Sequence, residues 1–578
     1  MDPILAWLRR QWNAWDVRVL VLLSLSLQII LYIFGNRRKY MVSFWISAVV
    51  WVAYLTADWV ATIALSKLSD VLSEPGYDKA NSGNAALRGL WAPLLLVHLG
   101  GPDTITAYSL EDNRLWPRHW LSLFVQAAVA LYAILLSWRF NFWISFLTFP
   151  ALWLDTLKTF MEQYDLYRSF SLRFGNSKYL GDDSVMWKAM ECELGLMYDL
   201  LYTKASVIYT KAGFFLRCIS LVCTISLTVG FICFVSDMEK WKDEYNIAIP
   251  DIAVTGALII GTMVLETYAT VLSFSTDWAV IWTEAKRGIV GHPCCVFNDR
   301  RRWSNVMGQF NLYESWENGR PSRSWKGSGL MLELHKTCIP VPPNIRSKIL
   351  GFIRSLDSCD DEDLGQKLCG GLLGFGSSEF GWGILALHLI TELFYKNKLQ
   401  LLEKVRSGRN PAFGSTIKPS EYDRDTRETC RILSNYMMYL LLLRSSMLPI
   451  VGVEAFKKTI IGDSSNTRDT LLDLIFSSQP PLPSRILDSF HRMIDTASSP
   501  STSNSSSPWV VLTNAWLAIL LYTAKECKAN EHLQQLRRGG ELLTILWFLL
   551  PQSDWFLDVS DLSPVINAKL NFIFGMGP

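Results

Sequence analysis

The sequence predicts an all-α fold: a polytopic bundle of membrane helices followed by a cytosolic helical domain. Half of the 578 residues are apolar and only 19% are charged, below the roughly 25% usual in soluble proteins. Half of the 24 tryptophans fall before residue 154, among several long apolar runs, and tryptophan is enriched at membrane interfaces. Beyond residue 275 the apolar runs are shorter and interrupted, as in a helical domain outside the membrane.

Residues 1–290 are predicted to form the membrane domain. A spanning helix needs about 20 mostly apolar residues. Two of the candidate runs are short, and each is open to interpretation as a spanning, re-entrant or interfacial helix. Residues 158–211 are predicted to be a helical cytosolic insert, and the bundle to have six or seven crossings. The candidate helices lie near 17–34, 41–65, 85–99 (short), 120–138, 142–157 (short), 214–235 and 252–274.

Loop charges predict the orientation, because cytosolic loops are enriched in Lys and Arg. The loop Ser236–Asp251 holds two lysines against five acids, whereas Ser275–Arg302 holds five basic residues. The acidic loop is therefore predicted to be external and the C-terminus cytosolic. With seven crossings, which we favour, the turn Arg37–Lys39 also lies inside; with six, the turn and the N-terminus change sides.

The rest of the chain divides into three predicted parts. Residues 291–370 form a juxtamembrane connector, 371–555 a cytosolic helical domain, and 556–578 a C-terminal tail. The run Trp509–Ala524 comes closest to a further span. Asn514 interrupts it, and its length suits a buried core helix.

The most unusual stretch is "LGGPDTITAYSLEDNRLWPRHW", residues 99–120. Glycines followed by proline end a helix. Ser109 is then placed to cap a new helix, with Glu111 and Asp112 in the first turn, where the helix dipole favours acids. This pattern predicts a turn at the membrane surface. The alternative is a cation or ligand site formed by Asp103, Glu111 and Asp112 at a helix break.

Two carboxylates fall inside predicted spans, Asp58 and Glu266. A charge at the bilayer centre costs several kcal/mol (about 2.5–3.5 on insertion scales), so such residues usually face the bundle and often mark function. Each residue has two interpretations: a role in ion movement or transport, or structural pairing with a neighbouring helix.

No catalytic, metal or cofactor site is predicted. The 11 cysteines include no C-x-x-C pair, and the H-E-x-x-H, G-x-x-x-x-G-K-[ST] and G-x-S-x-G patterns are absent. The net charge of +2 does not favour nucleic acid as a partner. The expected partners are the lipid bilayer and a protein bound by the C-terminal domain. A membrane-anchored interaction or signalling protein is the first hypothesis, and an ion channel or transporter that uses the intramembrane carboxylates is the alternative.

Several motifs resemble a plant membrane-protein family described as domain of unknown function 4220. They are the stretch at 99–120, "TADWVATIALSKLS" at 56–69 and "RRWSNVMGQFNL" at 301–312. The C-terminal part resembles domain of unknown function 594 in "ILALHLITELFY", "LSNYMMYLLLLRSSMLP" and "ECKANEHLQQLRRGGELLTILWFLL". The resemblance implies a plant integral-membrane protein with a cytosolic helical domain, and it implies no reaction, substrate or catalytic residue.

Overall fold

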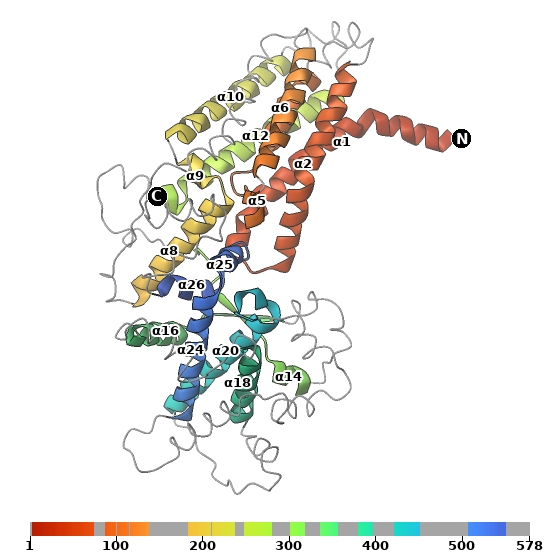
Figure 1. The fold of residues 1–578 in the computed structure, drawn as a ribbon. Helices are drawn as coiled ribbons and strands as arrows, with labels where there is room; N and C mark the ends of the chain where they lie inside the picture. Colours follow the sequence, from red (N-terminus) through yellow and green to blue (C-terminus); the bar gives the residue numbers. More distant parts are fainter. Residues whose placement is uncertain are drawn as a thin grey trace, which may run out of the picture.

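The structure is a computed structural model. It describes residues 3–73, 87–99, 101–114, 116–137, 183–209, 211–236, 248–279, 301–317, 336–356, 380–396, 421–450 and 507–550. Figure 1 shows two parts, a helical bundle and a second group of helices formed by the C-terminal half of the chain.

Long helices from the first half of the chain form the bundle. The 3-10 helix η1 (Arg37–Lys39) joins the first two, and the short helix α5 (Leu110–Arg114) precedes α6. Helix α10 lies at the periphery and packs mainly on α12 (Figure 1). The bundle helices are α1 (Pro3–Gly35), α2 (Phe44–Ser73), α4 (Trp91–Leu99), α6 (Trp116–Ser137), α10 (Lys211–Ser236) and α12 (Ile249–Phe274).

Within the described residues, four helices are long and apolar enough to cross a membrane: Trp15–Lys39, Phe44–Ser73, Gly213–Ser236 and Ile249–Phe274. These coincide with four of the predicted runs. Helices α4 and α6 lie at two further predicted runs, 85–99 and 120–138. The predicted run 142–157 lies outside the described residues.

The bundle buries small side chains and exposes large apolar ones. On α2, Ala53, Ala57, Ala61 and Ala64 are buried, four or three residues apart, so neighbouring helices approach closely. Trp45 and Trp59 on the opposite face are 72% and 67% exposed. In the described part of the chain, every exposed large apolar side chain lies between Trp15 and Phe274. A surface of this kind is stable against lipid and unfavourable against water.

One end of the bundle is closed by a buried ion cluster. Asp251, in the first turn of α12, is fully buried and accepts hydrogen bonds from Arg18 Nε at 2.7 Å and Arg88 Nε at 2.9 Å. We call this the distal end, because the C-terminal helices lie at the other, proximal end (Figure 1). The cluster ties α12 to α1 and to the segment before α4.

The C-terminal part is built around α20, which packs on α18 and α24. Its apolar side chains are mostly buried in protein. Helix α24 covers the run 509–524, and its central Trp516 has no exposed surface, so this run is a core helix here and not a fifth candidate span. The helices are α14 (Leu312–Glu317), α16 (Pro343–Leu356), α18 (Phe380–Tyr395), α20 (Glu421–Leu443), η5 (Ser445–Met447), α24 (Pro508–Glu526), α25 (Ala529–Leu536) and α26 (Leu542–Leu549).

The fold is mostly helical, but the all-α prediction misses a small antiparallel ribbon. Strand β1 (Val306–Gln309) pairs with β2 (Thr337–Pro340), with Met307 opposite Ile339. Four-residue strands show no periodicity that distinguishes them from loops. Tertiary packing selects this conformation, because Gly308 lies against the ring of Tyr439 on α20.

The core of the C-terminal part also includes residues from the predicted membrane domain. Helix α8 (Asp183–Tyr202) contributes Trp187, Met197 and Tyr198, and it packs on α25 and α26. It lies in the predicted helical insert, of which residues 158–182 are outside the described residues. One continuous core therefore includes residues on both sides of the predicted domain boundaries at residues 290 and 370. The boundaries themselves remain predictions.

Candidate functional site

A polar cavity lies at the proximal end of the bundle. It has a volume of about 250 Å³. We call it the junction cavity. Five regions meet there: the α1–α2 turn, the connector between α4 and α5, helices α8 and α9 (Ala205–Ile208), the end of α12 with the residues that follow it, and the segment that begins at residue 301. Its charged lining residues are Lys39, Asp103, Asp199, Asp277, Arg301 and Arg302.

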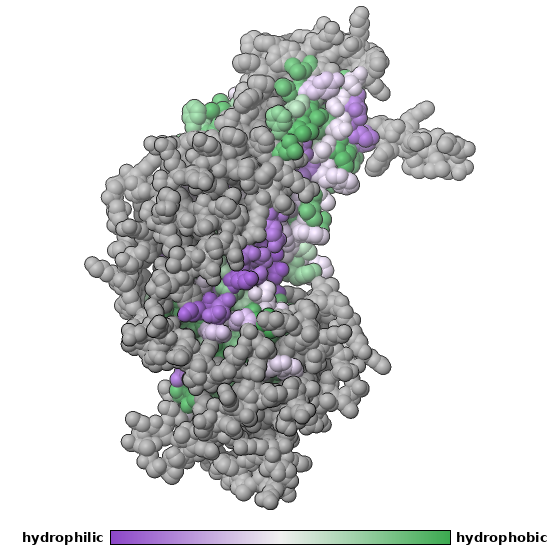
Figure 2. Space-filling model, viewed as in Figure 1, coloured by the Kyte–Doolittle hydropathy of each residue, from purple (hydrophilic) through white to green (hydrophobic). Residues whose placement is uncertain are grey.

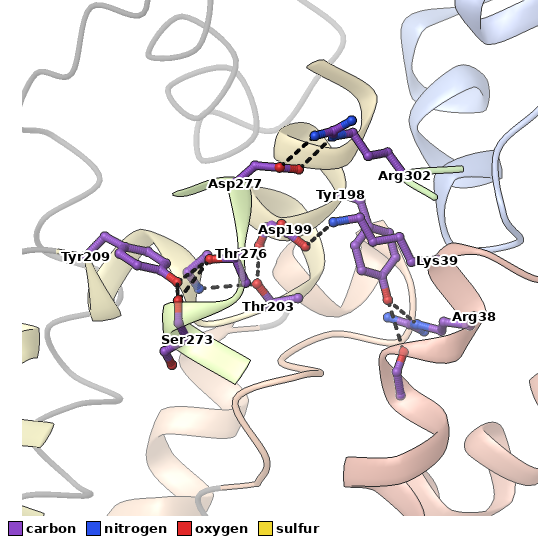
Figure 3. A network of polar contacts seen from close by, with 12 residues as sticks. Arg38, Lys39, Tyr198, Asp199, Thr203, Tyr209, Ser273, Thr276, Asp277 and Arg302 are labelled. Carbon is purple, nitrogen blue, oxygen red and sulfur yellow. Dashed lines mark hydrogen bonds and ion pairs between the residues drawn. The ribbon is translucent and has the colours of Figure 1, made fainter. Parts of the chain in front are cut away.

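Two ion pairs frame the junction cavity (Figure 3). Lys39 Nζ lies 2.8 Å from Asp199 Oδ1, and both side chains are buried. Arg302 binds Asp277 through two hydrogen bonds of 3.0 Å each, from Nε and from a terminal nitrogen. The first pair joins the α1–α2 turn to α8, and the second joins the end of α12 to the segment that begins at residue 301.

Helix ends place these residues. Helix α12 ends at Phe274, where the Ser275 N–H bonds to the Leu272 carbonyl at 2.9 Å, and this directs Thr276 and Asp277 to the cavity. Tyr209, which follows α9, hydrogen-bonds through its hydroxyl to the Ser273 carbonyl and to Thr276 (Figure 3). Burial raises the pKa of Tyr209 to about 12, so its hydroxyl is neutral at physiological pH.

Burial and neighbouring charges shift the pKa values of two charged groups in the cavity in opposite directions. Burial raises the pKa of the Asp199 carboxyl, and the Lys39 ammonium opposes that increase. For Arg302, burial lowers the pKa of the guanidinium, but the hydrogen bond and charge of Asp277 outweigh this and raise it. Within each pair, the charge of one partner therefore favours the ionised form of the other, as in other buried ion pairs.

The predicted site residues do not form one site. Asp103 lines the junction cavity and pairs with Arg217 of α10. Glu266 accepts a hydrogen bond from Ser220 at 2.6 Å and also acts electrostatically on Arg217. In the described residues, no group of three or more His, Cys, Asp or Glu side chains could hold a metal ion.

The other predicted residues lie around the α5 turn. Asp112 Oδ2 accepts the backbone N–H groups of Tyr108 and Ser109 at 2.9 and 2.8 Å. Glu111 accepts the Ser109 hydroxyl at 3.4 Å. The predicted capped turn is present: the Ser109 carbonyl accepts the Asp112 N–H at 3.2 Å, and the Asp112 carboxylate reaches back to the Ser109 N–H, as the third residue of a capping box does. In the described hydrogen bonds the Ser109 hydroxyl donates to Glu111. Asp58 is on the exposed side of α2, and it and Asp112 both act electrostatically on Tyr54.

Sequence reasoning missed most of the cavity. It used Lys39 and Arg302 only to count loop charges, and it did not single out Asp199 or Asp277. The sequence offered one signal for these four residues: each lies near the end of a predicted membrane helix, in the basic segment that follows the last one, or within the predicted insert. No spacing links Lys39 to Asp199, because residues 160 positions apart meet only in the folded chain.

A second set of contacts attaches the C-terminal part to the bundle. Arg38 is 1% exposed, and it donates to the Tyr198 hydroxyl at 2.8 Å and to the carbonyl of Ala107 at 2.8 Å. Arg537, after α25, lies 5.2 Å from the centre of the Tyr108 ring. Tyr202 of α8 donates to the Leu533 carbonyl of α25 at 3.0 Å.

The loop between α25 and α26 touches the α1–α2 turn. Gly539 has φ +89°, and its carbonyl accepts the Ser304 N–H at 2.9 Å. A Cβ atom at this position would lie 3.1 Å from Val42 Cγ2 and 3.4 Å from the carbonyl carbon of Met41. Glycine therefore permits both the left-handed backbone and the close approach. Figure 2 shows hydrophilic residues gathered at this level of the molecule.

Comparison with known families assigns both parts of the chain. Residues 51–178 and 163–316 match domain of unknown function DUF4220. Residues 501–553 match the protein of unknown function DUF594. The chain contains both domains. The DUF4220 matches extend from within α2 to α14 and include Ser304, and the DUF594 match covers α24 to α26. The hydrogen bond from Ser304 to Gly539 therefore joins DUF594 to DUF4220, whereas Met41 and Val42 precede the matched residues. No curated protein and no solved structure matches the chain.

Buried polar groups elsewhere are structural. His388 and Ser434 are hydrogen-bonded at 2.9 Å, but both are fully buried in the C-terminal core. Burial lowers the pKa of His388 to about 4, so the ring is neutral. Glu392 is bound by Arg431 at 2.8 Å. A buried serine and histidine cannot reach a substrate, and this cluster packs α18 against α20.

Proposed function

We propose that the protein is a multi-pass membrane protein, of the plant type that its motifs resemble, and that it is a membrane-anchored interaction or signalling protein. In this proposal the DUF594 domain is held in a fixed orientation on the cytosolic end of the bundle, where it binds a protein partner. The close contact of the Gly539 loop with the α1–α2 turn supports this proposal. A flexible tether would need neither the glycine nor the buried Arg38.

The same proposal sets the membrane topology. The proximal end carries Arg37–Lys39 and the basic segment at 301–302, so we place it in the cytosol. Helix α6 ends toward the distal end, whereas α8 lies at the proximal end (Figure 1). Seven crossings, with the predicted run 142–157 as the fifth, agree with these positions.

Glycosylation mapping tests the topology. An acceptor site inserted near Glu244 is expected to be modified, because the acidic loop faces the lumen during synthesis. The natural sequon at Asn504 is expected to remain unmodified. Glycosylation at each site is measured as a shift in gel mobility that endoglycosidase treatment removes. Modification at Asn504 with none near Glu244 reverses the orientation and contradicts the proposal.

The channel or transporter alternative has weaker support. It requires carboxylates that converge on one path. In the described residues, Asp103 and Glu266 surround Arg217, whereas Asp58 and Asp112 lie near Tyr54. Glu266 has a hydrogen-bond partner on α10, which suits a role in holding α10 to α12.

The variant Gly539→Ala tests the docked orientation. The added Cβ meets the α1–α2 turn, so we expect the DUF594 domain to loosen and become more sensitive to limited proteolysis. Gly101→Ala is the matched control, because Gly101 also has a positive φ, +71°, but a Cβ there meets nothing within 4 Å. Both variants carry similar backbone strain, but only Gly539→Ala disturbs the contact with the α1–α2 turn.

Proximity labelling in cells gives the functional measurement. A biotin ligase fused to the C-terminus is expected to label a set of cytosolic proteins in the wild type and in Gly101→Ala, and to lose that set in Gly539→Ala. An unchanged set in Gly539→Ala, despite increased proteolysis, contradicts a role for the docked orientation. Cation flux above that of protein-free liposomes, measured with purified wild type, favours the channel alternative.

A further inference from the structure

We propose that the junction cavity binds the headgroup of a zwitterionic phospholipid, with a phosphodiester and a primary ammonium group. This binding site is separate from the proposed protein-interaction role, and it holds for either orientation of the bundle. The argument rests on the position of the cavity, its charge balance and the unused hydrogen-bonding capacity of its buried ion pair.

The position is at the boundary where candidate spans end. Lys39 is the last residue of the span Trp15–Lys39, and the cavity wall includes the last turn of α12. Leu272 and Ala269 supply apolar surface on that wall, beside the polar residues. Lipid headgroups lie at this level of a bilayer. A volume of about 250 Å³ is below the roughly 300–1,000 Å³ of pockets for drug-sized ligands, so it suits a headgroup and not a whole lipid.

The charge balance favours a zwitterion. The lining carries three basic and three acidic side chains. Arg217 binds Asp103 and Arg302 binds Asp277, so Arg301 and the Lys39–Asp199 pair are left to face a ligand. A phosphate monoester would meet the Asp199 carboxylate, and a divalent metal ion would meet the charges of Lys39 and Arg301. A ligand with both a phosphodiester and an ammonium matches both signs. The acids are Asp103, Asp199 and Asp277, and the bases are Lys39, Arg301 and Arg302.

The buried pair Lys39–Asp199 has hydrogen-bonding capacity that the described residues do not use. An ammonium has three donors, and a carboxylate accepts about four hydrogen bonds. Among the described residues, Lys39 Nζ makes one hydrogen bond, to Asp199. A buried ion pair is favourable only when its remaining donors and acceptors are satisfied. The phosphate would accept from Lys39, and the ligand's ammonium would donate to Asp199.

Arg301 provides the entrance to the site. Its side chain is exposed at the edge of the cavity, and it forms no ion pair with another described residue. Its guanidinium is therefore available to bind the phosphodiester. The adjacent Arg302 is already bound to Asp277 and serves to hold the wall.

Thermal stabilisation of the purified full-length protein in detergent tests the site. The probes are short-chain phosphatidylethanolamine, free phosphoethanolamine and short-chain phosphatidic acid. A ligand that binds the folded state raises its melting temperature, and the increase grows with the logarithm of its concentration once this exceeds Kd. We expect phosphatidylethanolamine to stabilise at the lowest concentration. Equal potency of free phosphoethanolamine overturns the lipid source, and equal or greater potency of phosphatidic acid overturns the zwitterion.

Variants connect the effect to the cavity. Arg301→Gln is expected to raise the required concentration of phosphatidylethanolamine about tenfold, the typical loss for one charged contact. Lys67→Gln, which removes an exposed charge at the distal end, is the control and is expected to change nothing. The double variant Lys39→Met with Asp199→Leu replaces the buried pair by apolar residues and is expected to abolish the stabilisation. No stabilisation of the wild type, or identical responses of Arg301→Gln and Lys67→Gln, overturns the proposal.

Discussion

The substitution Asp251→Asn is expected to lower the stability of the bundle by about 3–5 kcal/mol, the usual cost of breaking a buried ion pair by removing one partner. Asp251 has no exposed surface and binds both Arg18 and Arg88. Asparagine keeps the shape but removes the negative charge that both guanidinium groups bind at the distal end. The measurement is the melting temperature of the full-length protein in detergent.

Lys67→Gln is the matched control for this prediction. It removes the ion pair of Lys67 with Asp16, 2.9 Å long, in which the lysine side chain is 50% exposed. Exposed pairs contribute about 0–1 kcal/mol, so its melting temperature should stay close to that of the wild type. Similar small losses in both variants would mean that water reaches Asp251 and screens its charges.

Gly308→Ala is expected to destabilise the C-terminal core by about 1–3 kcal/mol or more, as overpacking does. The new Cβ would lie 2.5 Å from ring atoms of Tyr439. That ring cannot move aside easily, because it is buried and its hydroxyl donates to Glu541 at 2.7 Å. We expect a lower melting temperature and earlier protease cleavage of the C-terminal part.

Gly351→Ala provides the comparison. Gly351 is in α16, and a Cβ there meets nothing within 4 Å. Alanine is the better helix former by about 0.8–1.0 kcal/mol, so this variant should be as stable as the wild type or more so. If both glycine variants behave alike, Tyr439 has room to shift and β1 is not packed as described.

The apolar helices and the local turn were accessible to sequence reasoning because both depend on residues close together in the chain. Membrane helices satisfy their own backbone and need only apolar length, so runs such as 17–34 and 252–274 coincide with candidate spans. The capped turn at Glu111 and Asp112 depends on neighbours three or four residues apart, and it too was predicted. The pattern left open which side chain satisfies the turn, because serine and aspartate can do so in different ways.

By itself, the sequence determined the mostly helical fold, the positions of the apolar helices and the presence of further helices in the C-terminal half of the chain. Only the tertiary structure decided what meets at the junction. Lys39 and Asp199 are 160 residues apart, as are Arg38 and Tyr198, and the Gly539 loop approaches the α1–α2 turn from the far end of the chain. Such contacts depend on how helices pack, and packing is set by side-chain volume and charge across the whole core, which no local pattern encodes.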